Sequence, residues 1–354
     1  MIGDGVILHV AGLDKFIPPF IKLVKSEFNE DDHRYWLTGS VKKYPIELDK
    51  NITLCGSSLK DKAVGYSQLI KKLHSSEKII LHGLFNIRVV VLLACMPWLH
   101  KKCYWVLWGG DLYVRRNATR TLFWKIKEIF RTILIARLHA ITTTVPGDFE
   151  LVRKWYSTRA KYIPSLMYDS HVARSLELKS SSDKKLINIQ VGNSADPENR
   201  HAEVFDKLEQ LSGEVKFNVY CPLSYGNEDY AQKVIEKGAS LFREGFLPLT
   251  DFMSFDEYNR YMATIDVAIF NHRRQQAMGN IIGLLSMGKT VYLRPTETPY
   301  QFFKELGITV FSSDAIGEGL KVLSEKQKQK NIELVRREFS RDSLVESWRL
   351  IFNE

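Results

Sequence analysis

The sequence has few cysteines and no long apolar run. Its four cysteines, Cys55, Cys95, Cys103 and Cys221, form no CxxC pair and lack histidines at metal-ligand spacing. This argues against a disulfide framework and a zinc site. The longest apolar stretch, Val89 to Met96, is far shorter than the roughly 20 residues that span a bilayer. We therefore expect any membrane contact to be peripheral. The first residues carry no secretory signal pattern, so the protein is expected to stay in the cytoplasm.

Low-complexity tracts and internal repeats are also missing. A chain that is 45% hydrophobic and 26% charged is typical of a folded globular protein, which excludes the disordered and fibrous classes. Its 354 residues indicate two domains at about 150 residues each. The formal net charge of +9 indicates an anionic partner, but nucleic acid, anionic lipid and a phosphorylated small molecule all satisfy it.

Short apolar strands alternate with amphipathic helical stretches, which is typical of α/β domains with parallel sheets. In the second half, the expected helices cover 199–211, 229–237, 255–264 and 280–287. The expected strands are 6–10, 35–38, 78–81, 103–107, 140–143, 186–191, 215–221, 241–243, 267–270 and 290–293.

The polar, Ser-rich stretch before Leu186 divides the chain. We expect one domain over 1–165, a linker over 166–185 and a second domain over 186–325. The remaining residues, 326–354, have apolar periodicity that suits terminal helices packing near a cleft. In open parallel sheets ligands bind beyond the carboxyl ends of the strands, so function is expected in the loops that follow strands.

A glycine turn follows the predicted strand LINIQV. Gly192, Asn193 and Ser194 stand there, ahead of a helix expected to begin near Asn199. Glycine permits a tight turn, and a helix N-terminus offers free N–H groups to an anion. The sequence therefore favours a phosphate-binding loop, although simple capping of the helix by Ser194 or Asp196 stays open.

A second polar segment follows the predicted strand DVAIF. Guanidinium groups bind phosphate oxygens bidentately, and amide side chains can reach sugar hydroxyls or a base edge. A solvated basic loop is the alternative, but the pattern favours a diphosphate sugar. The segment contains Asn271, Arg273, Arg274, Gln275, Gln276, Gly279 and Asn280.

Two predicted strand ends in the first half carry groups suited to proton transfer. His82 follows one strand, and Trp108 and Asp111 follow another. A histidine or a carboxylate at such a position can act as a general base, and an indole face can stack on a sugar. A structural histidine and a helix-capping aspartate are the alternatives.

The stretch from Arg115 to His139 mixes basic residues with large apolar ones, and Glu128 is its only acid. A helix of this composition can lie on an anionic membrane with its cations at the headgroups. An ordinary packed helix with a solvated basic face explains the pattern equally well.

Taken together, these segments resemble the TDP-N-acetylfucosamine:lipid II N-acetylfucosaminyltransferase family, which completes the repeat unit of enterobacterial common antigen. The resemblance runs in order through LHVAG, LHGLFN, LWGGDLY, VGNSADPENRH and RQQAMGNIIGLLSMGK, so it covers most of the chain. Two positions depart from the family motifs: Gly110 replaces Ala in WGADLY, and Ala277 replaces Gly in RQQGIGT.

The resemblance implies a GT-B architecture, in which two Rossmann-like domains face each other across a cleft. The C-terminal domain would hold the nucleotide sugar and the N-terminal domain the acceptor. It also implies an inverting reaction without a metal, with which the absence of a DxD sequence agrees. No cofactor is then expected, since Arg, backbone N–H groups and a helix dipole stabilise the departing diphosphate.

The resemblance also implies roles for individual residues. Asp111 is the first choice for the catalytic base and His82 the second. The acceptor side is expected to include His9, Asn86, Trp108 and Tyr113. The donor side comprises Gly192, Asn193 and Ser194 at the diphosphate, Arg274 at the phosphate charge, and Gln275, Gln276 and Asn280 near the sugar or nucleoside. Asn271, Arg273 and Gly279 are also expected to bind the donor. In the loop after a strand, Tyr220 and Tyr225 are expected to stack on the base.

The expected partners are a nucleotide-sugar donor, a polyprenyl-diphosphate-linked glycan acceptor and an anionic membrane surface. This places the protein on the cytoplasmic face of the bacterial inner membrane. The expected donor is a dTDP-linked 4-acetamido-4,6-dideoxyhexose, and another 6-deoxyhexose or a UDP or GDP donor for O-antigen is the alternative. A basic nucleic-acid-binding protein is the non-enzyme alternative, which strand-end loops in both halves disfavour.

Overall fold

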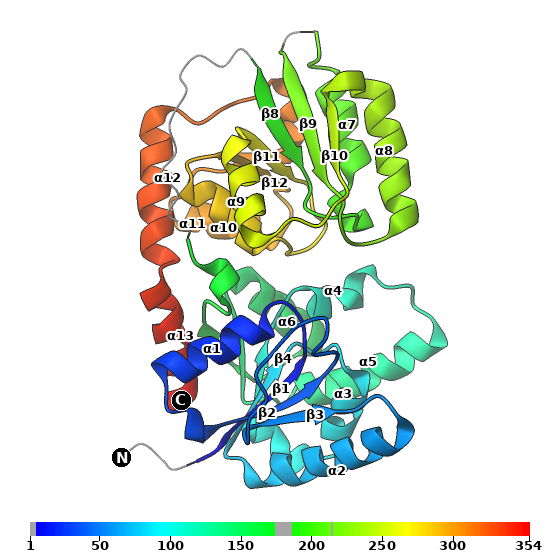
Figure 1. The fold of residues 1–354 in the computed structure, drawn as a ribbon, viewed down its shortest axis with the longest axis vertical. Coiled ribbons are helices and arrows are strands. Elements are labelled where there is room, and N and C mark those ends of the chain that lie inside the picture. The colour runs from blue at the N-terminus through cyan, green and yellow to red at the C-terminus, as the bar shows by residue number, and fades with distance from the viewer. Residues whose placement is uncertain (1–4, 174–185, 214) are drawn as a thin grey trace. The chain divides into compact units, whose positions relative to one another are not determined.

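The computed structural model describes residues 5–173, 186–213 and 215–354. The chain forms two compact units, unit 1 from Met1–Ser170 and Arg341–Glu354 and unit 2 from His171–Ser340 (Figure 1). Each unit contains a parallel sheet and its own helices, which confirms the predicted α/β class. No helix in the described ranges combines the length and the apolar character needed to span a bilayer.

Unit 1 has a seven-stranded sheet in the order β3-β2-β1-β4-β5-β6-β7. The strand order reverses direction between β1 and β4, and in such sheets ligands bind at this switch point. Its strands are β1 Ile7–Gly12, β2 His33–Thr38, β3 Ile52–Cys55, β4 Lys78–His82, β5 Cys103–Val106, β6 Ala140–Thr143 and β7 Lys161–Pro164. Its helices are α1 Ile17–Glu27, α2 Leu59–Ser75, α3 Ile87–Ala94, α4 Gly110–Asn117, α5 Leu122–Ile135, α6 Pro146–Tyr156 and α13 Arg341–Asn353.

Unit 2 has a six-stranded sheet in the order β10-β9-β8-β11-β12-β13, so its switch point lies between β8 and β11. Its strands are β8 Ile187–Val191, β9 Phe217–Pro222, β10 Phe246–Leu249, β11 Val267–Phe270, β12 Thr290–Leu293 and β13 Phe311–Ser312. Its helices are α7 His201–Glu209, α8 Glu228–Phe242, α9 Phe255–Thr264, α10 Met278–Ser286, α11 Thr298–Glu305 and α12 Glu325–Glu338.

The last helix, α13, belongs to unit 1 and lies beside α1 (Figure 1). Trp348 is fully buried and donates its indole N–H to the carbonyl oxygen of Met167 at 3.0 Å. Lys78 of β4 donates to the carbonyl oxygens of Ile351 and Phe352 at 2.8 and 2.9 Å, which satisfies acceptors at the C-terminal end of the helix. The chain end is therefore part of the unit 1 core.

Several predicted limits differ from the structure. The terminal segment expected over 326–354 is split, because α12 lies in unit 2 and α13 in unit 1. The structure divides after Ser170, whereas most of the expected linker, 174–185, lies outside the described residues. The predicted strand 241–243 is wrong, since α8 runs to Phe242, whose ring packs against Phe205 and Phe217.

Candidate active site

Gly192 ends β8 in a conformation that favours glycine, with φ of 69°. A Cβ added there would lie 2.5 Å from Nε2 of His201 and 2.7 Å from Oδ1 of Asn199. Both contacts are too close for a side chain, so glycine is required for the turn that leads from β8 towards α7. The predicted tight turn is therefore present at the switch point of unit 2.

Asn193 connects the loops that follow three neighbouring strands. Its amide nitrogen Nδ2 donates to the hydroxyl of Tyr225 after β9 at 2.9 Å. Its Oδ1 accepts from Nε2 of Gln276 after β11 at 3.0 Å. Because Asn193 is also buried, these bonds fix the relative positions of the loops that sequence analysis assigned to the donor.

A second set of bonds fixes the β11 loop against the β8 loop. Arg274 donates to the carboxylate of Asp196 at 2.7 Å. Asn199 is fully buried, and its Oδ1 accepts from the backbone N–H of Asn193 at 3.0 Å and lies 2.9 Å from Nε2 of His272. Burial, assisted by the charge of Arg274, holds the pKa of His272 well below its usual range, so the ring is neutral at pH 7 and Nε2–H donates to Asn199.

Three buried polar atoms in the β11 loop and in α7 have no hydrogen-bond partner. They are Oε1 of Gln275, Oε1 of Gln276 and Nε2 of His201. Leaving such an atom unpaired costs about 1–3 kcal/mol each, so polar atoms of this kind are normally satisfied. Their clustering at the switch point indicates a site that a polar ligand completes.

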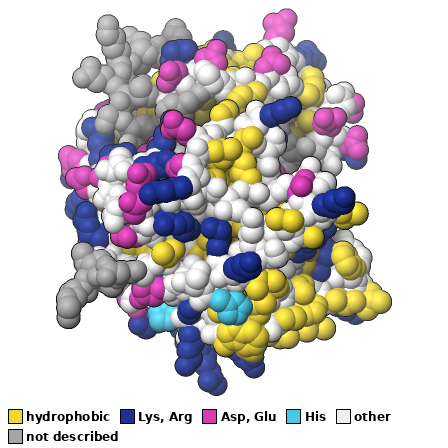
Figure 2. Space-filling model, turned by 60° about the horizontal axis from the view of Figure 1, so that its bottom comes forward, with side chains coloured by type: hydrophobic (Ala, Val, Ile, Leu, Met, Phe, Trp, Pro, Cys, Tyr) yellow, Lys and Arg dark blue, Asp and Glu magenta, His cyan; other side chains and the backbone are white. Residues whose placement is uncertain are grey.

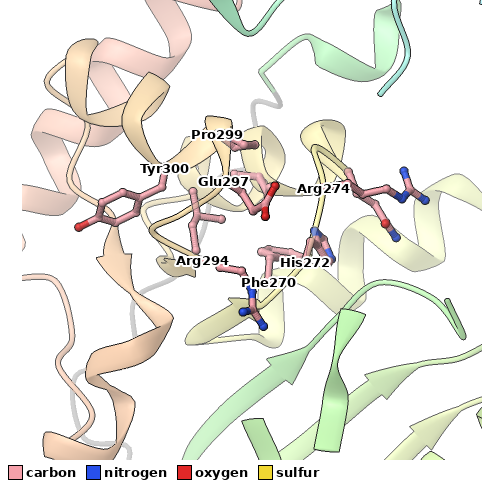
Figure 3. A pocket seen from close by; sticks show the side chains of 10 residues that line it. Phe270, His272, Arg274, Arg294, Glu297, Pro299 and Tyr300 are labelled. Atoms are coloured by element: carbon pink, nitrogen blue, oxygen red, sulfur yellow. The ribbon is translucent and has the colours of Figure 1, made fainter. Parts of the chain in front are cut away.

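A pocket opens between the β11 loop and the segment after β12 (Figure 3). Arg294 and Glu297, which follow β12, lie around the same hollow as His272 and Arg274. Arg294 forms an ion pair with Glu203 of α7 at 2.5 Å. The hollow is small, so it suits only one part of a larger ligand.

Sequence analysis missed Arg294 and Glu297, although both follow a correctly predicted strand. It also misplaced Tyr220, which lies within β9 opposite Gln190 and packs against Tyr261 of α9, not in the loop beyond. Tyr225 does lie in that loop.

The other predicted donor residues lie in three different environments. Asn271 is buried and bonds to Glu203 and to Ser313 of the segment after β13, which gives it a supporting position. Arg273 is exposed. Gly279 and Asn280 lie in the first turn of α10, a helix whose N-terminus has no side-chain cap. Free N–H groups at such an end suit an anion.

Ala277 precedes α10 with φ of 58°, in the left-handed region that glycine tolerates better than alanine. We expect Ala277→Gly to raise the free energy of unfolding by about 1 kcal/mol, because it removes this strain. Urea titration measures the change. Ala231→Gly, inside α8, is the matched control and should lose about 1 kcal/mol. A loss of stability in both variants would show that the backbone at Ala277 is not strained.

In unit 1, the carboxylate of Asp111 is buried and accepts three hydrogen bonds. The donors are the backbone N–H of Leu84 at 2.9 Å, Nε1 of Trp105 at 2.7 Å and the backbone N–H of Trp108 at 3.0 Å. Burial raises the pKa of the carboxyl, against the opposing effect of these donors. Asp111 thus joins the loops after β4 and β5, and with 2% exposure it does not face solvent.

His82 belongs to a chain of hydrogen bonds in unit 1. Its Nδ1 lies 2.7 Å from the hydroxyl of Tyr168, and its Nε2 lies 3.0 Å from Nδ1 of His9. His9 continues to Nδ1 of His33 at 3.0 Å, while Trp108 donates to Tyr168 at 2.8 Å. An indole N–H can only donate a hydrogen bond. If every group donates to the next, the direction of donation is therefore from Trp108 through Tyr168 to the histidines.

Burial keeps these histidines neutral. It lowers the pKa of His82 to about 3 and that of His33 to about 4. Each imidazole then has one donor and one acceptor nitrogen, and both nitrogens of His82 are occupied. The second candidate base is therefore engaged in the structure, as the first is.

The predicted acceptor residues differ in accessibility. His9 and Tyr113 are buried, and Tyr113 donates to Asp148 of α6 at 2.9 Å. Asn86 caps α3 by accepting from the backbone N–H groups of Arg88 and Val89. Trp108 is partly exposed and packs between Phe16 and Phe85, with ring centroids 5.2 and 5.8 Å away. Of the four, Asn86 and Trp108 are partly exposed.

Asp14 is a strand-end carboxylate that sequence analysis missed. It follows β1 at the switch point of unit 1, and its Oδ1 accepts from the backbone N–H of Phe16 at 2.8 Å. Burial raises the pKa of its carboxyl to about 6, although backbone N–H groups and Lys15 oppose the shift. A partly buried carboxylate with a pKa near neutrality has the properties of a general base.

Comparison with known proteins identifies the family. The family described as 4-alpha-L-fucosyltransferase, glycosyl transferase group 56, matches the chain over residues 39–353. The chain belongs to glycosyltransferase group 56. This confirms the family resemblance carried by the sequence motifs and identifies the protein as a glycosyltransferase that depends on a nucleotide sugar.

Solved structures support the fold of this group 56 protein. Anabaena Alr3699/HepE in complex with UDP and glucose matches with a TM-score of 0.68, 12% identity and coverage of 98% of this chain and 99% of that one. WaaG, a glycosyltransferase involved in lipopolysaccharide biosynthesis, matches with a TM-score of 0.63, 11% identity and coverage of 98% of both chains. The fold is GT-B, as predicted.

In the described part of the group 56 chain, no three His, Cys, Asp or Glu side chains are grouped so that they could hold a metal ion. Arg274 and Arg294 line the pocket of unit 2. Guanidinium groups and helix N-termini stabilise phosphate charge by hydrogen bonding and electrostatics. Metal-independent transfer stays a prediction.

Proposed function

We propose that this group 56 glycosyltransferase moves a 4-acetamido-4,6-dideoxyhexose from a dTDP-sugar to a lipid-linked glycan, with inversion and without a metal. The reaction would take place at the cytoplasmic face of the bacterial inner membrane, during synthesis of enterobacterial common antigen or a related surface glycan. The motif resemblance supports the donor and the acceptor, and family membership supports the class of reaction.

The arrangement at the switch point of unit 2 carries the donor assignment. Gly192 supplies a tight turn, and the uncapped N-terminus of α10 supplies N–H groups suited to a diphosphate. Arg274 lies next to them, and the unpartnered oxygens of Gln275 and Gln276 would accept from sugar or base N–H and O–H groups. One loop cluster thus offers cations for phosphate and neutral acceptors for the remainder of the donor.

On the acceptor side, we propose Asp14 as the catalytic base in place of Asp111 and His82. The base takes the proton of the acceptor hydroxyl, whose oxygen attacks the anomeric carbon while the bond to the diphosphate breaks and dTDP leaves. Asp111 and His82 already use their acceptor atoms in buried bonds. Asp14 is partly exposed beside the aromatic group of Phe16 and Trp108, which suits it to a bound hydroxyl.

Binding of dTDP is expected to raise the unfolding temperature, and the rise should persist in EDTA. Arg274→Ala should weaken dTDP binding about 10–100-fold, because a hydrogen bond to a charged group contributes about 1.5–3 kcal/mol. Thermal unfolding across dTDP, UDP, GDP and CMP concentrations measures both effects.

Arg337→Ala is the matched control, since this arginine of α12 is exposed in the same unit. It should bind dTDP as the wild type does. A shift with UDP or GDP alone would replace the proposed donor with the alternative one. Absence of a shift with every nucleotide would contradict the donor site itself.

A further inference from the structure

Helix α5 is oriented with its apolar face outward. Leu122, Phe123 and Ile129 are 76%, 66% and 59% exposed, and Ile126 and Ile133 are also exposed. Residues 122, 126, 129 and 133 recur at the spacing of one helix face, so they form a continuous stripe. Figure 2 shows hydrophobic side chains gathered at the lower right of the face drawn there, the side on which α5 lies in Figure 1.

The inward face of α5 holds charged residues whose bonds fix this orientation. Arg131 is 5% exposed and donates to the carbonyl oxygens of Leu84 and Asp111. Glu128, also buried, forms ion pairs with Arg131 and with Arg115 of α4. Turning the apolar stripe inward would break these bonds and leave buried charges unpaired, which is strongly unfavourable.

Basic side chains flank the apolar stripe. Lys127 lies 4.0 Å from the ring centre of Phe123, and Lys125 is exposed on the same helix. Arg120 stands just before the helix and Arg116 in the last turn of α4, and Glu128, the only acid from Arg115 to His139, is buried. Aliphatic and aromatic residues edged by cations are the arrangement found in helices that lie at an anionic membrane surface.

We propose that α5 docks the protein on an anionic lipid bilayer, with its outward apolar stripe in the acyl boundary and its lysines and arginines at the headgroups. This deepens the membrane location proposed above by naming the surface, and it does not depend on the identity of the donor sugar. Since Arg131 bonds to the carbonyl oxygens of Leu84 and Asp111, the docked helix also supports the loops of the proposed acceptor side.

The test is co-sedimentation of the full chain with vesicles of phosphatidylcholine containing about one third phosphatidylglycerol. The wild type should bind them, bind pure phosphatidylcholine at least tenfold less, and be released by about 0.5 M salt. The variant Leu122→Ser/Ile126→Ser/Ile129→Ser should bind at least tenfold more weakly. Leu59→Ser/Val64→Ser, which changes exposed residues of α2 in the same unit, is the matched control and should bind normally.

The α5 variant should retain the wild-type unfolding temperature and the dTDP-induced shift, which separates docking from the proposed donor site. If the triple variant proves unstable, Ile129→Asp on the same face serves as the second variant. Failure of the wild type to bind anionic vesicles, or equal binding by a folded α5 variant, would overturn the proposal. A wild-type dimer in solution that the α5 variant makes monomeric would also overturn it and assign the stripe to a second copy.

Discussion

Replacing Asp14 with asparagine is expected to lower kcat for sugar transfer by about 10²–10⁴-fold, the range that a general base contributes. Binding of dTDP should stay unchanged, because Asp14 lies in unit 1 and the proposed donor site in unit 2. The measurement is transfer from the dTDP-sugar to a polyprenyl-diphosphate glycan, with the exposed Asp31→Asn as control. Wild-type rates in Asp14→Asn would contradict the assignment and return the base to Asp111 or His82.

The pH dependence gives a second measure of the same carboxylate. Because the pKa of Asp14 is raised to about 6, kcat/KM should fall as pH drops below about 6 and the base becomes protonated. Burial causes the shift, opposed by the N–H groups of Phe16 and Ile17 and by the charge of Lys15. The low-pH limb should therefore be absent from the residual activity of Asp14→Asn.

Whether Asp14→Asn is more or less stable than the wild type distinguishes a catalytic role of Asp14 from a structural one. Between about pH 4 and 6 the folded protein keeps the Asp14 proton that the unfolded chain loses, so stability falls as pH rises through this window. At pH 7 the full cost of the buried charge is present, about 1–2 kcal/mol after allowing for partial exposure. Asp14→Asn should thus be more stable than the wild type at pH 7 while losing activity, a pattern found where function opposes stability.

The parallel sheets explain which residues of the candidate site could be predicted from the sequence. Carboxyl ends of parallel strands gather at one edge, so the strand-end loops at Gly192 and Arg274 could be assigned to one site from sequence. The same rule would have found Arg294 after β12. Asp14 also follows a predicted strand, but it stands in no motif, and the property that marks it is partial burial beside aromatic rings, which requires the folded chain.

Other outcomes depended on tertiary contacts. The short apolar run at 241–243 fits a strand or a helix, and packing of Phe242 against Phe205 decides for α8. The amphipathic pattern of α5 predicts a helix but not which face is buried. Arg131 decides that, since its bonds to the loops at Leu84 and Asp111 place the charged face inward.

Asp111→Ala is expected to lower the free energy of unfolding by at least about 3 kcal/mol, because three buried donors lose their acceptor and each costs about 1–3 kcal/mol. Asp111→Asn should lose less, since one amide oxygen can still accept from Leu84 and Trp105 while only the bond from Trp108 is lost. Urea titration ranks both against Asp31→Ala, an exposed control. If Asp111 were the catalytic base, Asp111→Asn would be inactive but as stable as the wild type. Measuring both the free energy of unfolding and the transfer rate therefore distinguishes the structural role of Asp111 from the catalytic role of Asp14.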